Sequence, residues 1–356
     1  MSNKFIHLFQ NCIPVKGHKR SVIYDLQKLE YHLIPNALFE IIIESKNKPI
    51  LQLKERYGPE HELIINEYID FLLSNQLAIL LDKEQLDKFP PVSLDWFYPG
   101  AISNAVLDLG DWCNSDLTKV ISELHQIGCL NVQIRSFGNL SGDMILSIFQ
   151  LFENTRITSI EAIIKYNASV DELTWQQKAS QYTRIRNIQI HSCPPGHLIK
   201  SSPISNIFFY PYSLTSESDC GTICPQYFNV NFELFTEALN FNTCLNKKIA
   251  IDRNGLIKNC PSMSSSFGNV RDNSLLDVLK VENFKYLWSL KKDDILICKD
   301  CEFRYMCTDC RAYLSEPENI NSKPLKCGYD PYHAEWTDWK KQNFALKASE
   351  TYHFKE

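Results

Sequence analysis

The sequence lacks several features that would assign it to a class at once. No stretch approaches the ~18 uninterrupted apolar residues of a membrane span, and residues 1–7 lack the apolar core of a secretory signal peptide. No Gly-rich phosphate loop, HExxH pair or Ser/His/Asp set stands out, and the nine histidines are scattered without ligand spacing. We therefore expect no membrane association, and no nucleotide-hydrolysing or zinc-protease motif is present.

The chain also lacks an excess of positive charge. Its net charge of −5 and isoelectric point near 6.0 argue against a broad nucleic-acid surface. Hydrophobic residues make up 44% and charged residues 22% of the 356 residues, which describes a globular protein of two or three domains. Thirteen cysteines without a signal peptide favour metal chemistry in a reducing compartment over disulfides, so we expect a cytoplasmic location.

Cysteine is abundant in one stretch. Seven of the thirteen fall between positions 244 and 327, and two of the intervals are CxxC loops that lie five residues apart. A CxxC loop turns two thiolates onto one metal ion or one cluster, so this spacing predicts a thiolate-ligated site. The predicted ligands are Cys244, Cys260, Cys298, Cys301, Cys307, Cys310 and Cys327.

The spacing leaves the metal open. Zinc and iron–sulfur clusters each take up to four thiolates, so seven cysteines fill one site and leave a second one short. Scattered buried thiols are the alternative, because cysteine is among the most buried residue types, but such thiols need no regular spacing.

The order of these cysteines, with four residues between Gly255 and Cys260, resembles that of the SPASM domain of radical-SAM peptide-modifying enzymes. The sequence from Cys298 to Tyr313, followed by the sequence from Lys326 to Pro331, resembles the grasp-with-spasm group of SPASM proteins. Proteins of this group work beside an ATP-grasp ligase. That resemblance implies up to two [4Fe-4S] clusters. One would bind Cys298, Cys301, Cys307 and Cys327; the other would bind Cys244, Cys260 and Cys310, with one position open. The family usually has three residues between the cysteines that match Cys307 and Cys310, and here there are two.

Residues 1–90 are predicted to form a first unit of three strands followed by three helices. The order resembles the winged-helix-like leader-peptide recognition domain of peptide-maturation systems. That resemblance implies that a precursor peptide adds a strand along Leu29–Ile34, beside a helix over His61–Leu73. The predicted peptide-binding residues are Leu29, Tyr31, Leu33, Tyr68 and Leu72. A DNA-binding winged helix and simple packing against a neighbour are the alternatives.

Residues 91–225 alternate between strand and helix patterns, which predicts a parallel α/β sheet curled into a partial barrel. A sheet of this kind precedes the SPASM domain in radical-SAM enzymes. Those enzymes carry Cys-x3-Cys-x2-Cys after the first barrel strand, where this chain has only Cys113. We therefore expect no S-adenosylmethionine cluster. Ser169 and Glu172 form a capping box for a further helix.

Four other cysteines, Cys12, Cys113, Cys129 and Cys193, are interpreted as ordinary thiols. Either Cys220 or Cys224 is a candidate for the open position of the Cys244 cluster.

Residues 226–356 are predicted to be the SPASM iron–sulfur domain with a C-terminal helix that carries Trp336 and Trp339. Asn254-Gly255 predicts a hairpin that brings Cys244 and Cys260 to one end. Lys299, Arg304 and Lys326 lie near the cysteines in sequence and are candidates to offset thiolate charge, or are simply solvated.

The predicted fold class is α/β, α+β overall: a winged-helix-like domain, a degenerate radical-SAM-like barrel and a SPASM domain. The predicted function is a maturation component for ribosomally made peptides, with a precursor peptide and an ATP-grasp ligase as partners. Two alternatives remain at this stage: a non-catalytic zinc-binding scaffold for peptide or protein interaction, and a radical enzyme that uses an unusual cluster site.

Overall fold

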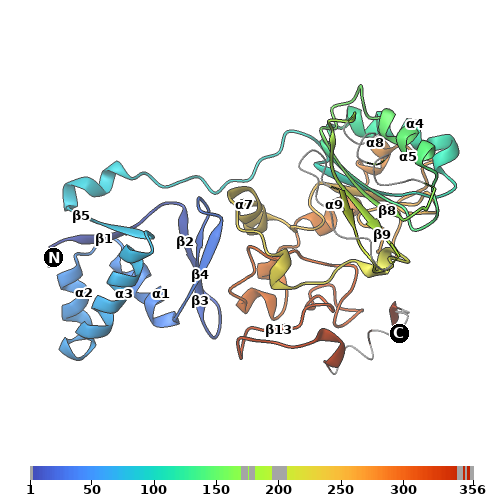
Figure 1. Cartoon of the computed structure of the whole chain (residues 1–356). Helices are drawn as coiled ribbons and strands as arrows, with labels where there is room; N and C mark the ends of the chain where they lie inside the picture. The colour runs from blue at the N-terminus through green and yellow to red at the C-terminus, as the bar shows by residue number, and fades with distance from the viewer. Residues whose placement is uncertain are drawn as a thin grey trace.

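The computed structural model describes residues 3–169, 175, 181–194, 207–342, 348 and 351–352. Three regions are visible in Figure 1: an N-terminal unit, a large sheet with helices, and a cysteine-rich region of loops and short elements. An extended linker, residues 89–103, joins the first to the second. Among the described residues, no helix has the length and apolar character needed to cross a bilayer.

The N-terminal unit contains the predicted run of three strands and three helices, with one further strand before it and one after it. Its three central strands form an antiparallel sheet in the order β2-β3-β4, and the first strand pairs with the last. The elements are β1 (Phe5–Leu8), β2 (Cys12–Val15), β3 (Ser21–Asp25), β4 (Glu30–Ile34), α1 (Asn36–Ser45), α2 (Ile50–Tyr57), α3 (Glu62–Ser74) and β5 (Ala78–Leu81).

The start of α1 is tied to the β2–β3 turn. Pro35 is the N-cap of α1 and provides no side-chain cap hydrogen bond. The Asn36 side chain instead accepts a hydrogen bond from Ser21 Oγ (2.6 Å) and donates one to the His18 carbonyl (2.8 Å). Asn36 therefore holds the β2–β3 turn against the start of the helix.

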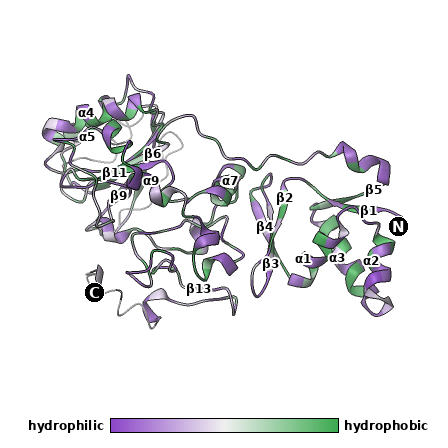
Figure 2. Ribbon diagram, turned by 180° about the vertical axis from the view of Figure 1, so that it is seen from behind, coloured by the Kyte–Doolittle hydropathy of each residue, from purple (hydrophilic) through white to green (hydrophobic). Residues whose placement is uncertain are grey.

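The sheet of this unit is covered on both faces. On one face, Ile23 and Ile34 pack with Leu38, Ile65 and Leu72 of the helices, and Figure 2 shows hydrophobic colour over much of α1 and α3. On the other face, Val15, Val22, Tyr24 and Leu26 share a core with the cysteine-rich region, so all five residues of β3 are buried. The N-terminal unit is thus docked on the cysteine-rich region.

The central sheet has seven strands in the order β10-β9-β8-β7-β6-β11-β12, and all pairs are parallel except β11-β12. Its core contains apolar side chains of α4 and α5. The predicted parallel α/β sheet is confirmed, whereas the helix predicted to begin at the Ser169–Glu172 capping box lies largely outside the described residues. The elements are β6 (Asn104–Asp108), α4 (Cys113–Gln126), β7 (Asn131–Arg135), α5 (Gly142–Gln150), β8 (Ser159–Lys165), β9 (Ile185–His191), β10 (Ile207–Phe209), β11 (Lys248–Ile251) and β12 (Ile257–Lys258).

The hairpin predicted for the C-terminal region is present, with Gly255 at φ 80° in its turn. Its first strand, β11, also pairs in parallel with β6, from Lys248 opposite Asn104 to Ile251 opposite Leu107. The sequence did not predict this pairing. The sheet is therefore continuous between the α/β part of the chain and the cysteine-rich region.

The remaining elements of the cysteine-rich region are short. They are α7 (Phe232–Asn240), α8 (Leu275–Val278), α9 (Glu282–Lys285), β13 (Tyr329–Asp330) and β14 (Glu335–Trp336). The C-terminal helix prediction is wrong for its two tryptophans, because Trp336 lies in β14 and Trp339 begins a single 3-10 turn. Trp336 instead packs on the rings of Tyr329 and Phe303.

Short 3-10 turns connect these elements. They are η1 (Pro59–His61), η2 (Lys83–Lys88), η3 (Glu217–Asp219), η4 (Pro225–Tyr227), η5 (Tyr286–Trp288), η6 (Lys292–Asp294), η7 (Cys298–Asp300) and η8 (Trp339–Lys341).

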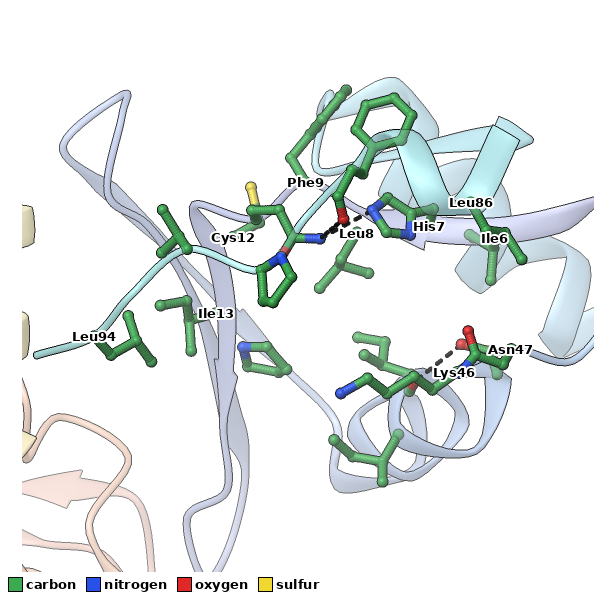
Figure 3. A pocket seen from close by; sticks show the side chains of 18 of the residues that line it. Ile6, His7, Leu8, Phe9, Cys12, Ile13, Lys46, Asn47, Leu86 and Leu94 are labelled. Atoms are coloured by element: carbon green, nitrogen blue, oxygen red, sulfur yellow. Dashed lines mark hydrogen bonds between the residues drawn. The ribbon is translucent and has the colours of Figure 1, made fainter. Parts of the chain in front are cut away.

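A cavity of about 500 Å³ lies beside the outer edge of β2, bounded by β1, the end of α1 and the linker (Figure 3). Its lining is mostly apolar, and the linker is held over it by Phe89, whose ring lies 5.0 Å from that of His7. Phe89 also accepts a hydrogen bond from Gln10 through its carbonyl. The linker therefore covers one edge of the N-terminal sheet.

Candidate metal centre

The seven predicted ligands and Cys220 fall into two groups of four thiols. We name Cys298, Cys301, Cys307 and Cys327 the loop group, and Cys220, Cys244, Cys260 and Cys310 the sheet group. All eight are free cysteines. Burial raises the pKa of Cys244, Cys298, Cys301, Cys307 and Cys310, and charge on other thiols of the same group adds to each shift.

In the loop group, the 3-10 turn η7 carries Cys298 and leads directly to Cys301. Burial raises the pKa of Cys307 to about 12; Lys292 opposes the shift, and Cys327 and Cys298 add to it. Burial also raises the pKa of Cys301, and after Glu302 the neighbours that add to its shift are Cys298 and Cys307. Cys298, Cys307 and Cys327 are thus near one another, and Cys301 is near Cys298 and Cys307.

In the sheet group, Cys244 precedes β11 and Cys260 follows β12, so the hairpin brings them together as predicted. Burial raises the pKa of Cys310 to about 12, and charge on Cys244, Cys260 and Cys220 adds to this shift. Burial likewise raises the pKa of Cys244 to about 11, against the opposing effect of Lys248. Cys310 thus lies with the sheet group although it is only three residues from Cys307.

Cys220 takes the fourth place in the sheet group. Its loop is tied to the segment before Cys327: Lys326 donates to the carbonyls of Ser218 and Cys220, the latter at 2.7 Å, and Ile223 N donates to the Lys326 carbonyl. Gly221 has φ 90°, and a Cβ added there would lie 3.1 Å from Cys310 Sγ. Glycine is therefore needed for this loop to approach the thiols.

Two lysines that sequence reasoning missed are the cations in contact with the thiols. Lys248 Nζ lies 3.7 Å from Cys244 Sγ, and the buried Lys292 Nζ lies 3.9 Å from Cys298 Sγ. They lie four and six positions from Cys244 and Cys298, so proximity in the sequence is the signal that could have found them. A buried ammonium stabilises thiolate and offsets the negative charge of a cluster.

The three cations singled out from the sequence have different surroundings. Arg304 pairs with Asp293 at 3.0 Å and donates to the Lys16 carbonyl, so it joins the two regions rather than contacting a thiol. Lys299 is exposed. Lys326 holds the Cys220 loop, and its ammonium lies 4.3 Å from the Tyr313 ring centroid.

The N-terminal unit packs directly behind the loop group. Tyr24 Oη donates to the Glu302 carbonyl (2.7 Å) and accepts from the backbone N–H of Tyr305 (3.3 Å). The fully buried Glu302 carboxylate accepts from Arg20 (2.7 Å) and Tyr329 (2.5 Å). Glu302 follows Cys301, so β3 and the adjoining turn hold the first CxxC loop in place.

The donor set fits iron–sulfur clusters. Each group offers four thiols, the number that one [4Fe-4S] cluster takes, and each has a lysine against one sulfur. No set of three His, Cys, Asp or Glu side chains among the described residues is arranged to hold a single metal ion. In a cluster, by contrast, each thiolate binds its own iron.

The other predicted site residues lie elsewhere. Leu29, Tyr31 and Leu33 are exposed on and before β4, Tyr68 is half-buried on α3, and Leu72 lies in the core with 1% exposure.

Of the four remaining cysteines, Cys12, Cys129 and Cys193 are buried and Cys113 is half-buried. Burial raises the pKa of Cys113 to about 11, and the pKa values of Cys12 and Cys129 to about 12. The pKa of Cys193 is also raised by burial.

Comparison with known proteins supports part of this assignment. Residues 243–302 match the model of the SPASM family, described as an iron–sulfur cluster-binding domain. This span includes Cys244, Cys260, Cys298 and Cys301.

Two crystal structures of SuiB from Streptococcus suis align with 91% of this chain and 98% of theirs. The first has 11% identity and a TM-score of 0.36; the second, bound to S-adenosylmethionine, has 10% and 0.34. Likeness at this level identifies neither a shared fold nor a shared activity. No curated protein matches the chain. What the comparisons support is thus a resemblance to the SPASM iron–sulfur cluster-binding domain across residues 243–302.

Proposed function

We propose that this protein is a maturation component for ribosomally made peptides, which holds two [4Fe-4S] clusters and binds a precursor peptide. The observation that carries the proposal is the presence of two groups of four thiols in a chain whose residues 243–302 match an iron–sulfur cluster-binding domain. The loop group holds one cluster and the sheet group, completed by Cys220, holds the other. The partner implied by the grasp-with-spasm resemblance is an ATP-grasp ligase.

The precursor peptide binds at β4 as an added strand. Among the described residues β4 pairs with β3 alone, so its outer edge offers unpaired backbone donors and acceptors. Leu33 and Tyr31 are 41% and 36% exposed, which provides apolar contacts beside that edge. Helix α3 lies next to it, since Phe71 contacts the His32 ring and Asn75 accepts from Lys28. Strand addition takes affinity from the backbone and selectivity from such side chains.

The opposite edge of the same sheet is unsuited to this role. Strand β2 carries Pro14, which has no N–H to donate, and the linker covers the cavity beside it. The sheet thus has one blocked edge and one open edge.

S-adenosylmethionine chemistry is not part of the proposal. Cys113 is a half-buried thiol at the first residue of α4, and it is the one cysteine where the radical-SAM resemblance would need three. At the carboxyl ends of β6 and β7, Asp108 is held by Arg135 through two hydrogen bonds of 2.6 and 2.8 Å. Sustained release of 5′-deoxyadenosine from S-adenosylmethionine in the presence of dithionite would show that the chain does cleave S-adenosylmethionine, contrary to this expectation.

The first test is anaerobic iron and sulfide analysis of the purified chain. We expect a brown protein that absorbs near ~400 nm and carries roughly eight irons, as two four-iron clusters require. A colourless protein with stoichiometric zinc would instead identify a zinc scaffold.

The second test is binding of the cognate precursor peptide to the full chain. Leu33→Asp places a charge beside the β4 edge and should weaken binding at least tenfold. The control is Leu276→Asp on α8, because Leu276 is 42% exposed and matches Leu33 in residue type and exposure. Equal affinities for the two variants would remove β4 from the proposal.

A further inference from the structure

The two thiol groups meet at one buried carboxylate. Cys307 belongs to the loop group and Cys310 to the sheet group, and Asp309 lies between them with 0% exposure. The segment is short because only Thr308 and Asp309 separate the two cysteines.

Asp309 is held by two buried cations and two uncharged side chains. Its carboxylate lies 3.2 Å from Lys292 Nζ and 2.8 Å from the Arg311 guanidinium. It also accepts a hydrogen bond of 2.7 Å from Asn242, while its backbone N–H donates to Thr243 Oγ1. Lys292 and Arg311 are 3% and 2% exposed, so water does not screen this charge.

The same network reaches both thiol groups. Lys292 Nζ lies 3.9 Å from Cys298 Sγ of the loop group. On the other side, Asn242 Oδ1 accepts from the backbone N–H of Cys244, a member of the sheet group. One carboxylate and two cations leave a net charge of +1 at the junction of the two groups.

We propose that the Lys292–Asp309–Arg311 network sets the reduction potentials of both clusters, with the larger effect on the loop-group cluster. This inference rests on the proposed function, because it concerns clusters bound by the two groups. Reduction adds one negative charge to a cluster, and fixed positive charge in a dry environment stabilises that state. The network acts on the clusters by its charge and does not bind substrate.

The test uses variants that change the network charge in opposite directions. Asp309→Asn raises it to +2, Lys292→Gln lowers it to 0, and the double variant restores +1. Anaerobic potentiometric titration followed by electron paramagnetic resonance measures each cluster. We expect Asp309→Asn to raise the loop-cluster potential and Lys292→Gln to lower it, each changing the one-electron equilibrium at least tenfold, or about 59 mV.

The double variant separates charge from shape. If charge sets the potential, the double variant returns close to the wild-type value, whereas a merely structural role predicts that it departs furthest. Lys299→Gln is the control, since Lys299 lies inside the first CxxC loop but is exposed; we expect no comparable shift. If Asp309→Asn does not retain iron, the potentials of Lys292→Gln and of the double variant still test whether the network charge sets the reduction potential.

The outcomes distinguish the two proposals. A wild-type chain without iron overturns the proposed function and this inference with it. A fully loaded chain whose potentials stay unmoved in the single variants, or move in the same direction in both, overturns this inference alone.

Discussion

The loop group and the sheet group each contain four cysteine thiols, but different parts of the molecule hold them. The loop group lies against the N-terminal unit, through Tyr24 and Glu302. The sheet group lies against the central sheet, through the β11–β12 hairpin and Lys248. They also differ in exposure, because three of the four loop-group cysteines are buried and only Cys310 of the sheet group is. Each group is therefore expected to stabilise a different interface, with the sheet group nearer to solvent.

The largest expected effect comes from removing one group at a time. Cys301→Ala with Cys307→Ala should remove about half the iron and loosen the N-terminal unit, because metal-binding energy at such sites is also folding energy. Cys244→Ala with Cys260→Ala should remove the other half and leave that unit docked. Iron analysis and hydrogen exchange of β3 measure the two effects. The proposed difference between the two groups is wrong if both double variants increase hydrogen exchange in β3 equally.

Gly221→Ala tests the approach of the Cys220 loop to the sheet group. Alanine at φ 90° with its Cβ 3.1 Å from Cys310 Sγ is strained, at a cost of about 1–3 kcal/mol. We expect partial loss of the sheet-group cluster alone, measured as iron per chain and by the spectrum of the remaining cluster. Gly138→Ala is the matched control, since an added Cβ there meets nothing within 4 Å. Loss of the loop-group cluster instead would contradict the assignment of Cys220.

Tyr24→Phe tests the interface behind the loop group. It removes the hydroxyl that joins the Glu302 carbonyl and the Tyr305 N–H, both buried, and should destabilise the docked unit by about 1–2 kcal/mol. Denaturant unfolding of the loaded chain measures the loss. Tyr227→Phe, at a side chain that is 65% exposed, should change nothing measurable.

The smallest expected effect is a pH dependence on the sheet-group side. Burial raises the pKa of Glu237 to about 7, although Asn246 donates to its carboxylate. A carboxyl whose folded pKa is raised stabilises the fold below its unfolded pKa of 4.5, and this stability is lost as pH rises through 7. Because Glu237 is only half-buried, we expect a loss of about 1 kcal/mol between pH 5 and 8. Glu237→Gln should flatten this part of the stability profile, and an unchanged slope would assign it to another group.

Residue spacing along the chain was enough to predict the features of the structure that depend on near neighbours in the sequence. The clustering of cysteines between positions 244 and 327 singled out seven thiols. Helical periodicity located α3 to within a residue or so. The proposed choice of Cys220 over Cys224 could not be made from sequence, because the Cys220 loop is held by Lys326, which is 106 residues away. Lys248 and Lys292, by contrast, lie only four and six positions from the cysteines they contact, Cys244 and Cys298, so these two contacts are local in the sequence.

The parallel pairing of β11 with β6 has a consequence for recombination between genes and for aggregation. A recombination event that replaced residues 226–356 would remove β11 and leave β6, Asn104–Asp108, as an open edge strand. Such an edge, with its inner residues Ala105 and Leu107 buried and its backbone unpaired, is a template for association with other chains. The two regions are thus expected to be exchanged between genes only as a unit.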